Sequence, residues 1–163
     1  MVITGGGMLA ITENTKNGGA SSWFAGATVP YATEISRDYV WDGPLVSAEA
    51  AQMLAYQAQH QNRSLSSIDN LIVASCTAKL TYHGEREGRE HYAFVYICDE
   101  YQEEGEACYK ITFGPGLIRL QQEQFLAQTY CSIIQHHARG MRDFNNPNVE
   151  KIDIEPTEGG LGF

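Results

Sequence analysis

The segment from His91 to Cys98, HYAFVYIC, constrains the fold more than any other stretch of the chain. It is apolar at nearly every position, which is typical of a strand that is covered on both faces. The next apolar segment, Ala107 to Phe113, alternates between apolar and polar residues, as a strand with two different faces does. The two segments are close enough in sequence to form a hairpin, with a turn at residues 103–105.

Two longer segments have helical periodicity. The first, SAEAAQMLAYQAQHQ, begins at Ser47, whose hydroxyl suits an N-cap, and Glu49 suits the positive end of the helix dipole. The second, from Leu117 to His137, carries an apolar stripe at a spacing of 3.6 residues. Both segments are therefore predicted to be helices that pack on the sheet.

Three further elements complete the predicted order. Leu71–Cys76 is short, apolar and β-branched, which indicates a buried strand. Trp23–Tyr31 is rich in aromatic and β-branched residues and is predicted to be a strand that ends near Pro30. Gly5–Gly7 is predicted to be a loop before a short helix. This order favours an α/β arrangement with helices on a mixed sheet.

The chain has 163 residues, which fits a single domain. From Gly140 onward the sequence is poor in large apolar residues and rich in Asn, Pro and Gly. We therefore predict a domain at residues 1–139 and an extended C-terminal tail at residues 140–163.

Composition excludes several classes of protein. The formal net charge is −9 and the eleven Lys and Arg residues are scattered, which argues against nucleic-acid binding. No apolar run approaches the length of a membrane span, and the N-terminus lacks the pattern of a signal peptide, so we expect a cytoplasmic protein without a membrane partner. None of the four cysteines forms a CxxC pair, so we expect buried free thiols and neither a metal nor a cofactor.

Four stretches together carry a resemblance to a known family. They are TGGGMLAIT, GGASSWFAGATVPYATE, VSAEAAQMLAYQA and FGPGLIRLQQEQFLAQT, and they lie between Thr4 and His137. In their order and pattern they resemble the C-terminal domain of the competence-damage protein CinA, the nicotinamide-nucleotide amidase family. The resemblance implies a three-layer α/β/α sandwich with a mixed sheet, and also a homo-oligomer.

The family hydrolyses the carboxamide of nicotinamide mononucleotide to the acid and releases ammonia. The resemblance thus implies an amide hydrolase with a serine nucleophile and with a tyrosine and a lysine nearby. A serine hydroxyl becomes a good nucleophile when a neighbouring base takes its proton, and a lysine can be that base if burial lowers its pKa.

This chain departs from the family at both reactive positions. The position of the family's serine is Val2, and that of its lysine is Ser36. The tyrosine and the glutamate of the same motif remain as Tyr31 and Glu34. The family's glycine-rich loop after the central strand is replaced by SCTAKLTYHG, residues 75–84.

The resemblance nonetheless assigns candidate residues to a site. The candidates for a catalytic role are Tyr31, Thr4 and Ser36. The ligand would be a small nucleotide like nicotinamide mononucleotide, and the residues assigned to its binding are Thr4, Gly5, Gly6, Tyr31, Glu34, Ser75, Thr77 and Arg119.

Three functions stay open from the sequence. The first is a non-catalytic relative that binds a small nucleotide or a protein. The second is an active nicotinamide-nucleotide amidase with rearranged catalytic groups. The third is a structural module that self-associates. The loss of both reactive residues favours the first and the third. The presence of Tyr31, Glu34 and the TGG turn keeps the second open, because the fold alone does not decide function.

Overall fold

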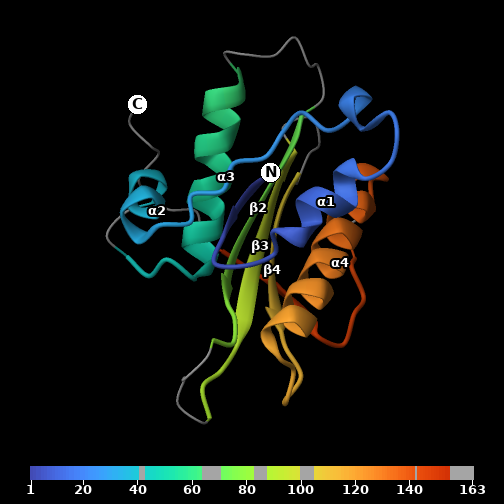
Figure 1. Ribbon diagram of the computed structural model, residues 1–163. Coiled ribbons are helices and arrows are strands. Elements are labelled where there is room, and N and C mark those ends of the chain that lie inside the picture. Colours follow the sequence, from blue (N-terminus) through green and yellow to red (C-terminus); the bar gives the residue numbers. More distant parts are fainter. Residues whose placement is uncertain (41–42, 64–70, 83–87, 100–104, 142, 155–163) are drawn as a thin grey trace.

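The computed structural model describes residues 1–40, 43–63, 71–82, 88–99, 105–141 and 143–154. Its centre is a five-stranded sheet with the strand order β1-β2-β3-β4-β5 (Figure 1). Strands β1 and β2 are parallel, and the remaining neighbours are antiparallel. The strands are β1 (Val2–Thr4), β2 (Ile72–Lys79), β3 (Tyr92–Asp99), β4 (Glu106–Thr112) and β5 (Val149–Ile152).

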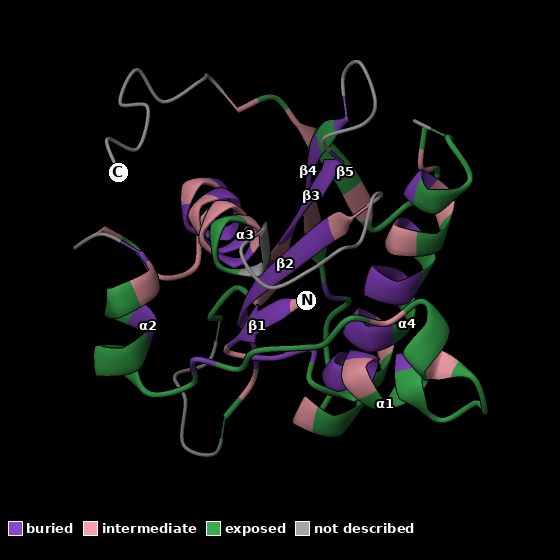
Figure 2. Cartoon of the chain, turned by 90° about the horizontal axis from the view of Figure 1, so that it is seen from above, coloured by how far each residue is buried: buried purple, intermediate pink, exposed green. Residues whose placement is uncertain are grey.

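Helices cover both faces of this sheet. Helices α1 (Leu9–Thr15) and α4 (Arg119–Ala138) lie together on one face. Helix α3 (Ala48–Arg63) covers the other face, with α2 (Thr33–Tyr39) beside it. Figure 2 shows the buried strands between these two helical layers. The predicted three-layer α/β/α sandwich with a mixed sheet is therefore confirmed.

Each helical layer packs against its own apolar core, because successive strand residues point to opposite faces. In β1, Val2 belongs to the core under α3, whereas Ile3 belongs to the core under α1 and α4. Strand β3 contributes Val95 to one core and Tyr96 to the other. This double burial explains the continuous apolar pattern of that strand.

The predicted start of helix α3 is confirmed in detail. The Ser47 hydroxyl accepts a hydrogen bond from the Ala50 amide at 3.1 Å, as expected of an N-cap. Glu49 lies in the first turn. All four cysteines are free and buried, as their apolar surroundings predict.

The prediction of a strand at Trp23–Tyr31 is wrong. This segment makes a single bridge, between Thr28 and Val2. Its partner β1 is only three residues long, and Pro30 has no amide hydrogen to extend a ladder.

Some predicted features lie elsewhere or outside the described residues. The extension after residue 140 contributes β5, which pairs with β4, while the boundary at residue 140 stays a prediction. Residues 83 and 84 of the segment that replaces the family's loop, and residues 103 and 104 of the predicted turn, lie outside the described residues. None of the described helices has the length and apolar character needed to cross a bilayer.

Candidate functional site

The predicted site lies at the carboxyl ends of the parallel strands β1 and β2. In the register of this pair Val2 lies opposite Ser75, and Thr4 lies opposite Thr77. Because side chains alternate along a strand, all four project toward the face that α3 covers. The turn Gly5–Gly7 then carries the chain across this end of the sheet to α1.

The glycine turn is tightly packed against β2. Gly5 has a φ of 76°, and a Cβ atom at this position would lie 2.1 Å from the Ala78 carbonyl oxygen. Gly7 has a φ of 91°, and its amide donates a 2.6 Å hydrogen bond to Oε2 of Glu123. The turn thus depends on glycine for its conformation, and one of its amides is already bound to a carboxylate.

Arg119 lies at this turn, as the resemblance predicts, but its donors point to protein groups. Its Nη2 donates to the Gly5 carbonyl oxygen at 2.9 Å and to Oε1 of Glu123 at 3.4 Å. Its Nη1 donates to the Thr81 carbonyl oxygen at 3.4 Å. The Glu123 carboxylate is nearly buried and neutralises Arg119, so it occupies the place beside the turn where an anionic ligand would bind.

Glu123 was not among the predicted site residues. It lies within the amphipathic helix α4, beside the buried Gln122, where the apolar stripe does not mark it. The one available signal is its spacing of four residues from Arg119, which allows an ion pair on a helix.

The structure brings Thr4 and Ser36 together, and it also fixes their protons. The Ser36 hydroxyl donates to the Pro30 carbonyl oxygen. The Thr4 and Ser36 hydroxyl oxygens are 3.3 Å apart. Because the single proton of Ser36 is used by Pro30, Thr4 donates to Ser36. Both residues are buried, and no basic side chain of the described residues is hydrogen-bonded to either hydroxyl.

The other nucleophilic groups of this region are equally unsuited to attack. Val2, which is buried in β1, has no nucleophilic atom in its side chain. The Ser75 hydroxyl donates to the Ala51 carbonyl oxygen of α3. Burial raises the pKa of the Cys76 thiol, and the nearby Glu123 charge raises it further. The Thr77 hydroxyl is buried without a hydrogen-bond partner among the described residues. A nucleophile needs a neighbouring base or a lowered pKa, and none of these groups has either.

Tyr31 and Glu34 lie apart from these buried groups. Tyr31 is 55% exposed, and Glu34 is exposed in the first turn of α2. Within the described residues, no hydrogen bond joins either side chain to the other predicted site residues. The structure therefore unites Thr4 with Ser36 and Gly5 with Arg119, and leaves Tyr31 and Glu34 facing solvent.

Metal-ligating residues do not converge anywhere in the described ranges. No group of three His, Cys, Asp or Glu side chains there could hold an ion. The adjacent His136 and His137 have different surroundings, as their helix predicts. His137 is buried, with Nε2 2.8 Å from the Tyr109 hydroxyl, while the His136 ring packs edge-on against Phe144.

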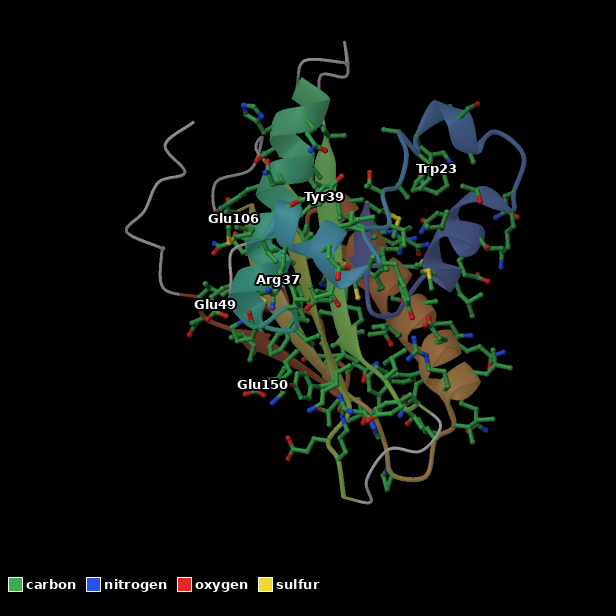
Figure 3. All side chains as sticks on the ribbon, turned by 60° about the vertical axis from the view of Figure 1, so that its left-hand side comes forward. Trp23, Arg37, Tyr39, Glu49, Glu106 and Glu150 are labelled. Carbon is green, nitrogen blue, oxygen red and sulfur yellow. The ribbon has the colours of Figure 1, made fainter. Side chains whose placement is uncertain are left out.

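A second polar cluster lies on the α3 face of the sheet, on strands β3 and β4. The Tyr96 hydroxyl donates to Oε2 of Glu106 at 2.6 Å, and the Tyr56 hydroxyl donates to the same oxygen at 2.9 Å. Burial raises the pKa of Tyr96, and its hydrogen bond to Glu106 raises it further. Glu106 lies on the same side of the molecule as Glu49 and Glu150 (Figure 3). The cluster ties α3 to the sheet.

No protein-family model matches the chain, and neither does any curated protein sequence. Solved structures with this fold include two bacterial proteins. The competence/damage-inducible protein CihA from Agrobacterium tumefaciens superposes with a TM-score of 0.65 at 16% identity, over 85% of each chain. A competence or damage-inducible protein from Enterobacter asburiae gives a TM-score of 0.59 at 9% identity, over 83% of this chain and 86% of that one. The chain thus has the fold of the competence/damage-inducible proteins, as its resemblance to CinA predicts.

Proposed function

We propose that this protein is a non-catalytic relative of the nicotinamide-nucleotide amidases that acts by binding. One observation carries this proposal. Val2 occupies the position of the family's serine, and the two hydroxyls beside it donate to protein oxygens instead of facing a base. Without an activated nucleophile, the carboxamide of a bound nucleotide has no group to attack it.

The glycine turn supports the same conclusion for the phosphate of such a ligand. In this chain the Gly7 amide and the Arg119 guanidinium both bind Glu123. A phosphate would have to displace a nearly buried carboxylate and leave it without partners, which costs free energy. Strong binding of a nucleotide phosphate at this turn is therefore not expected.

The exposed side chains around the turn favour a protein partner. Two large apolar residues lie on the segment before α2, a third lies within α2, and four more lie where α1 and α4 begin. They are Val29, Tyr31, Ile35, Met8, Leu9, Ile118 and Leu120. Exposed apolar groups near one edge are typical of interaction surfaces. We propose that a second copy of the chain binds here, in the cytoplasm, to give a homo-oligomer.

The measurement of mass in solution by light scattering tests the partner. The wild-type chain is expected to be a dimer at micromolar concentration, and Ile35→Lys is expected to shift it to the monomer. Met141→Lys is the matched control, because Met141 is exposed but follows the far end of α4. A monomeric wild type, or equal masses for both variants, would exclude self-association through this edge.

A nucleotide ligand is the second candidate, favoured by the exposed Tyr31 and Glu34. A rise in melting temperature with nicotinamide mononucleotide, lost in Tyr31→Ala, would establish it. Release of ammonia from the same compound would instead establish the active amidase with rearranged residues and overturn the non-catalytic proposal.

A further inference from the structure

A pocket of about 470 Å³ lies at the other end of β1, away from the glycine turn. Strand β2 pairs with β1 only from Ser75 onward, where Ser75 lies opposite Val2. The preceding residues Ile72, Val73 and Ala74 pair with β3 alone, and all three line the pocket. Its volume is within the range of about 300 to 1,000 Å³ that is typical of small-molecule sites. None of the predicted site residues lines it.

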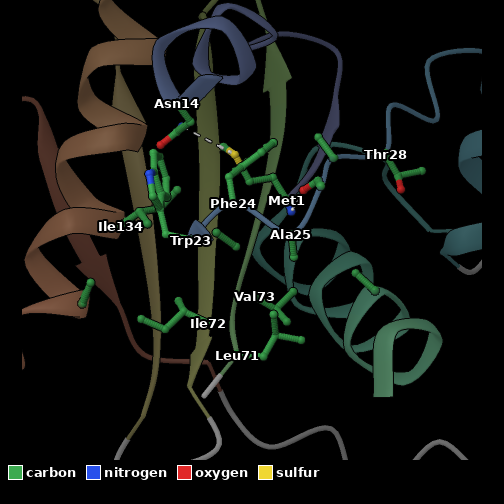
Figure 4. A pocket seen from close by; sticks show the side chains of 15 residues that line it. Met1, Asn14, Trp23, Phe24, Ala25, Thr28, Leu71, Ile72, Val73 and Ile134 are labelled. Carbon is green, nitrogen blue, oxygen red and sulfur yellow. Dashed lines mark hydrogen bonds between the residues drawn. The ribbon is translucent and has the colours of Figure 1, made fainter. Parts of the chain in front are cut away.

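The walls of this pocket come from both helical layers and from the segment before α2 (Figure 4). Ile134 and Ala138 of α4 and Ala58 of α3 line it, together with residues 23–28. Trp23 and Phe24 form an edge-to-face pair with ring centroids 6.0 Å apart. None of the side chains that line the pocket carries a formal charge, and burial lowers the pKa of the Met1 amino group, which donates to the Gly26 carbonyl oxygen at 2.8 Å, to about 6. Such walls suit an uncharged, flat molecule.

Asn14 supplies a polar group with a vacant acceptor. Its Nδ2 donates to the Ala10 carbonyl oxygen at 2.7 Å and to the sulfur atoms of Cys131 at 3.2 Å and Met1 at 3.7 Å. The Ala10 carbonyl oxygen only accepts, so the atom that contacts it at 2.7 Å carries an N–H and the opposite atom is the carbonyl oxygen Oδ1.

No described residue donates a hydrogen bond to Asn14 Oδ1, although Asn14 is only 6% exposed and lines the pocket. In Figure 4 this oxygen points away from the Met1 sulfur. Asn14 Oδ1 is not one of the fully buried unpaired atoms, so solvent reaches it, and it can accept a hydrogen bond from the N–H of a bound molecule.

We propose that this pocket binds a free, uncharged, planar heteroaromatic compound whose ring N–H donates to Asn14 Oδ1. The apolar floor contributed by β2 would bury one face of the ring, and Trp23 would pack against its edge or its other face. Trp23 is 60% exposed in the unliganded protein, so its indole is available to cover a ligand. This inference concerns a different site from the proposed self-association and does not depend on it.

Indole and benzofuran are the probes that test the acceptor. They share a bicyclic shape, but benzofuran has an oxygen atom in place of the N–H. Each compound is titrated into the whole chain, which carries any affinity tag at the C-terminus, and the Nε1–H resonance of Trp23 is followed by NMR. The resonance is assigned in the Trp41→Phe variant, which keeps Trp23 as its single tryptophan. Indole is expected to bind about fivefold more tightly than benzofuran, which corresponds to one net hydrogen bond.

Two variants locate the binding. Asn14→Ala is expected to make the two affinities equal, because it removes the acceptor. Ala138→Phe is expected to fill the pocket and to weaken indole binding at least tenfold, since Ala138 lines the pocket but is exposed. Gln128→Phe, at an exposed position of the same helix, is the control and should bind indole as the wild type does.

The inference fails under three results. The first is that the wild type shows no shift of the Trp23 resonance with millimolar indole. The second is that it binds indole and benzofuran with equal affinity. The third is that the Ala138→Phe variant binds indole as tightly as the wild type does. If Asn14→Ala does not fold, as judged by circular dichroism, the comparison of Ala138→Phe with Gln128→Phe still decides the location, and benzofuran still tests the donor.

Discussion

The two ends of strand β1 have opposite properties. At the carboxyl end, around the glycine turn, polar groups bind one another: Thr4 donates to Ser36, and Gly7 and Arg119 both donate to Glu123. At the amino end a pocket is open, and the nearly buried Asn14 keeps an unused acceptor toward it. In the region that the family resemblance marks, these polar groups are thus bound to protein groups, although the Thr77 hydroxyl is buried without a partner among the described residues. The family resemblance marks one end of β1, whereas the open pocket lies at the other end.

The largest expected effect concerns the glycine turn. Gly5→Ala places a methyl group 2.1 Å from the Ala78 carbonyl oxygen and forces an L-residue to a φ of 76°. We expect a loss of at least about 3 kcal/mol in the free energy of unfolding, measured by urea denaturation. Gly19→Ala is the matched control, because its φ is 85° but nothing lies within 4 Å, and it should cost only about 1 kcal/mol. Equal losses would show that the turn is not held tightly against β2.

The next effect concerns the carboxylate that closes the turn. Glu123→Gln removes the charge that accepts from Gly7 and Arg119, and we expect a loss of about 2 kcal/mol in the free energy of unfolding. Glu13→Gln removes an exposed carboxylate that pairs with Lys16 at 2.6 Å and should cost less than about 0.5 kcal/mol. If Glu123→Gln is as mild as this control, Glu123 does not occupy the site, and the turn is free for an anion.

A smaller effect is expected for the hydroxyl pair. Ser36→Ala leaves the Pro30 carbonyl oxygen without its donor and Thr4 without its acceptor, so we expect a loss of about 1 kcal/mol. Ser132→Ala, which removes an exposed hydroxyl bound to the Gln128 carbonyl oxygen, should be close to neutral. A stabilising effect of Ser36→Ala would indicate that this serine is kept for function at the expense of stability.

The last effect appears only at alkaline pH. Burial raises the pKa of Cys108 from 9.0 to about 12, with a further contribution from Glu49. Between these values the unfolded thiol loses its proton and the folded one keeps it, so the free energy of unfolding falls as pH rises above 9. Cys108→Ala should lessen this fall by at most about 1.4 kcal/mol per pH unit, and should leave the slope below pH 8 unchanged. An unchanged slope between pH 9 and 10.5 would contradict the burial of this thiol.

The sequence predicts the elements that have a strong apolar period. The β3–β4 hairpin, β2, α3 and α4 are all recognisable, because each buries a regular set of side chains. Three elements lack this signal. Strand β1 has only three residues, α2 buries only Ser36, and β5 is a half-exposed edge strand held by its ladder with β4. Their formation depends on neighbours that are distant in sequence.

The candidate site is predictable to a similar extent. The resemblance assigns both Arg119 and Gly5 to ligand binding, and the structure shows them hydrogen-bonded to each other, while the assignment itself stays a prediction. It could not reveal that Glu123 binds both groups of the turn, because a glutamate in an amphipathic helix looks like a surface residue until its partners are known. Asn14 is missed for the same reason, since its burial is set by α4 and Met1 rather than by its own helix.

Ammonia release from nicotinamide mononucleotide by the purified protein tests the central claim most directly. A chain with Val2 in place of the serine and with both nearby hydroxyls bound to protein oxygens should release no ammonia above the buffer control. Sustained release that is abolished in Ser36→Ala would contradict this account, because it would show that the hydroxyl pair can be activated in spite of its hydrogen bonds.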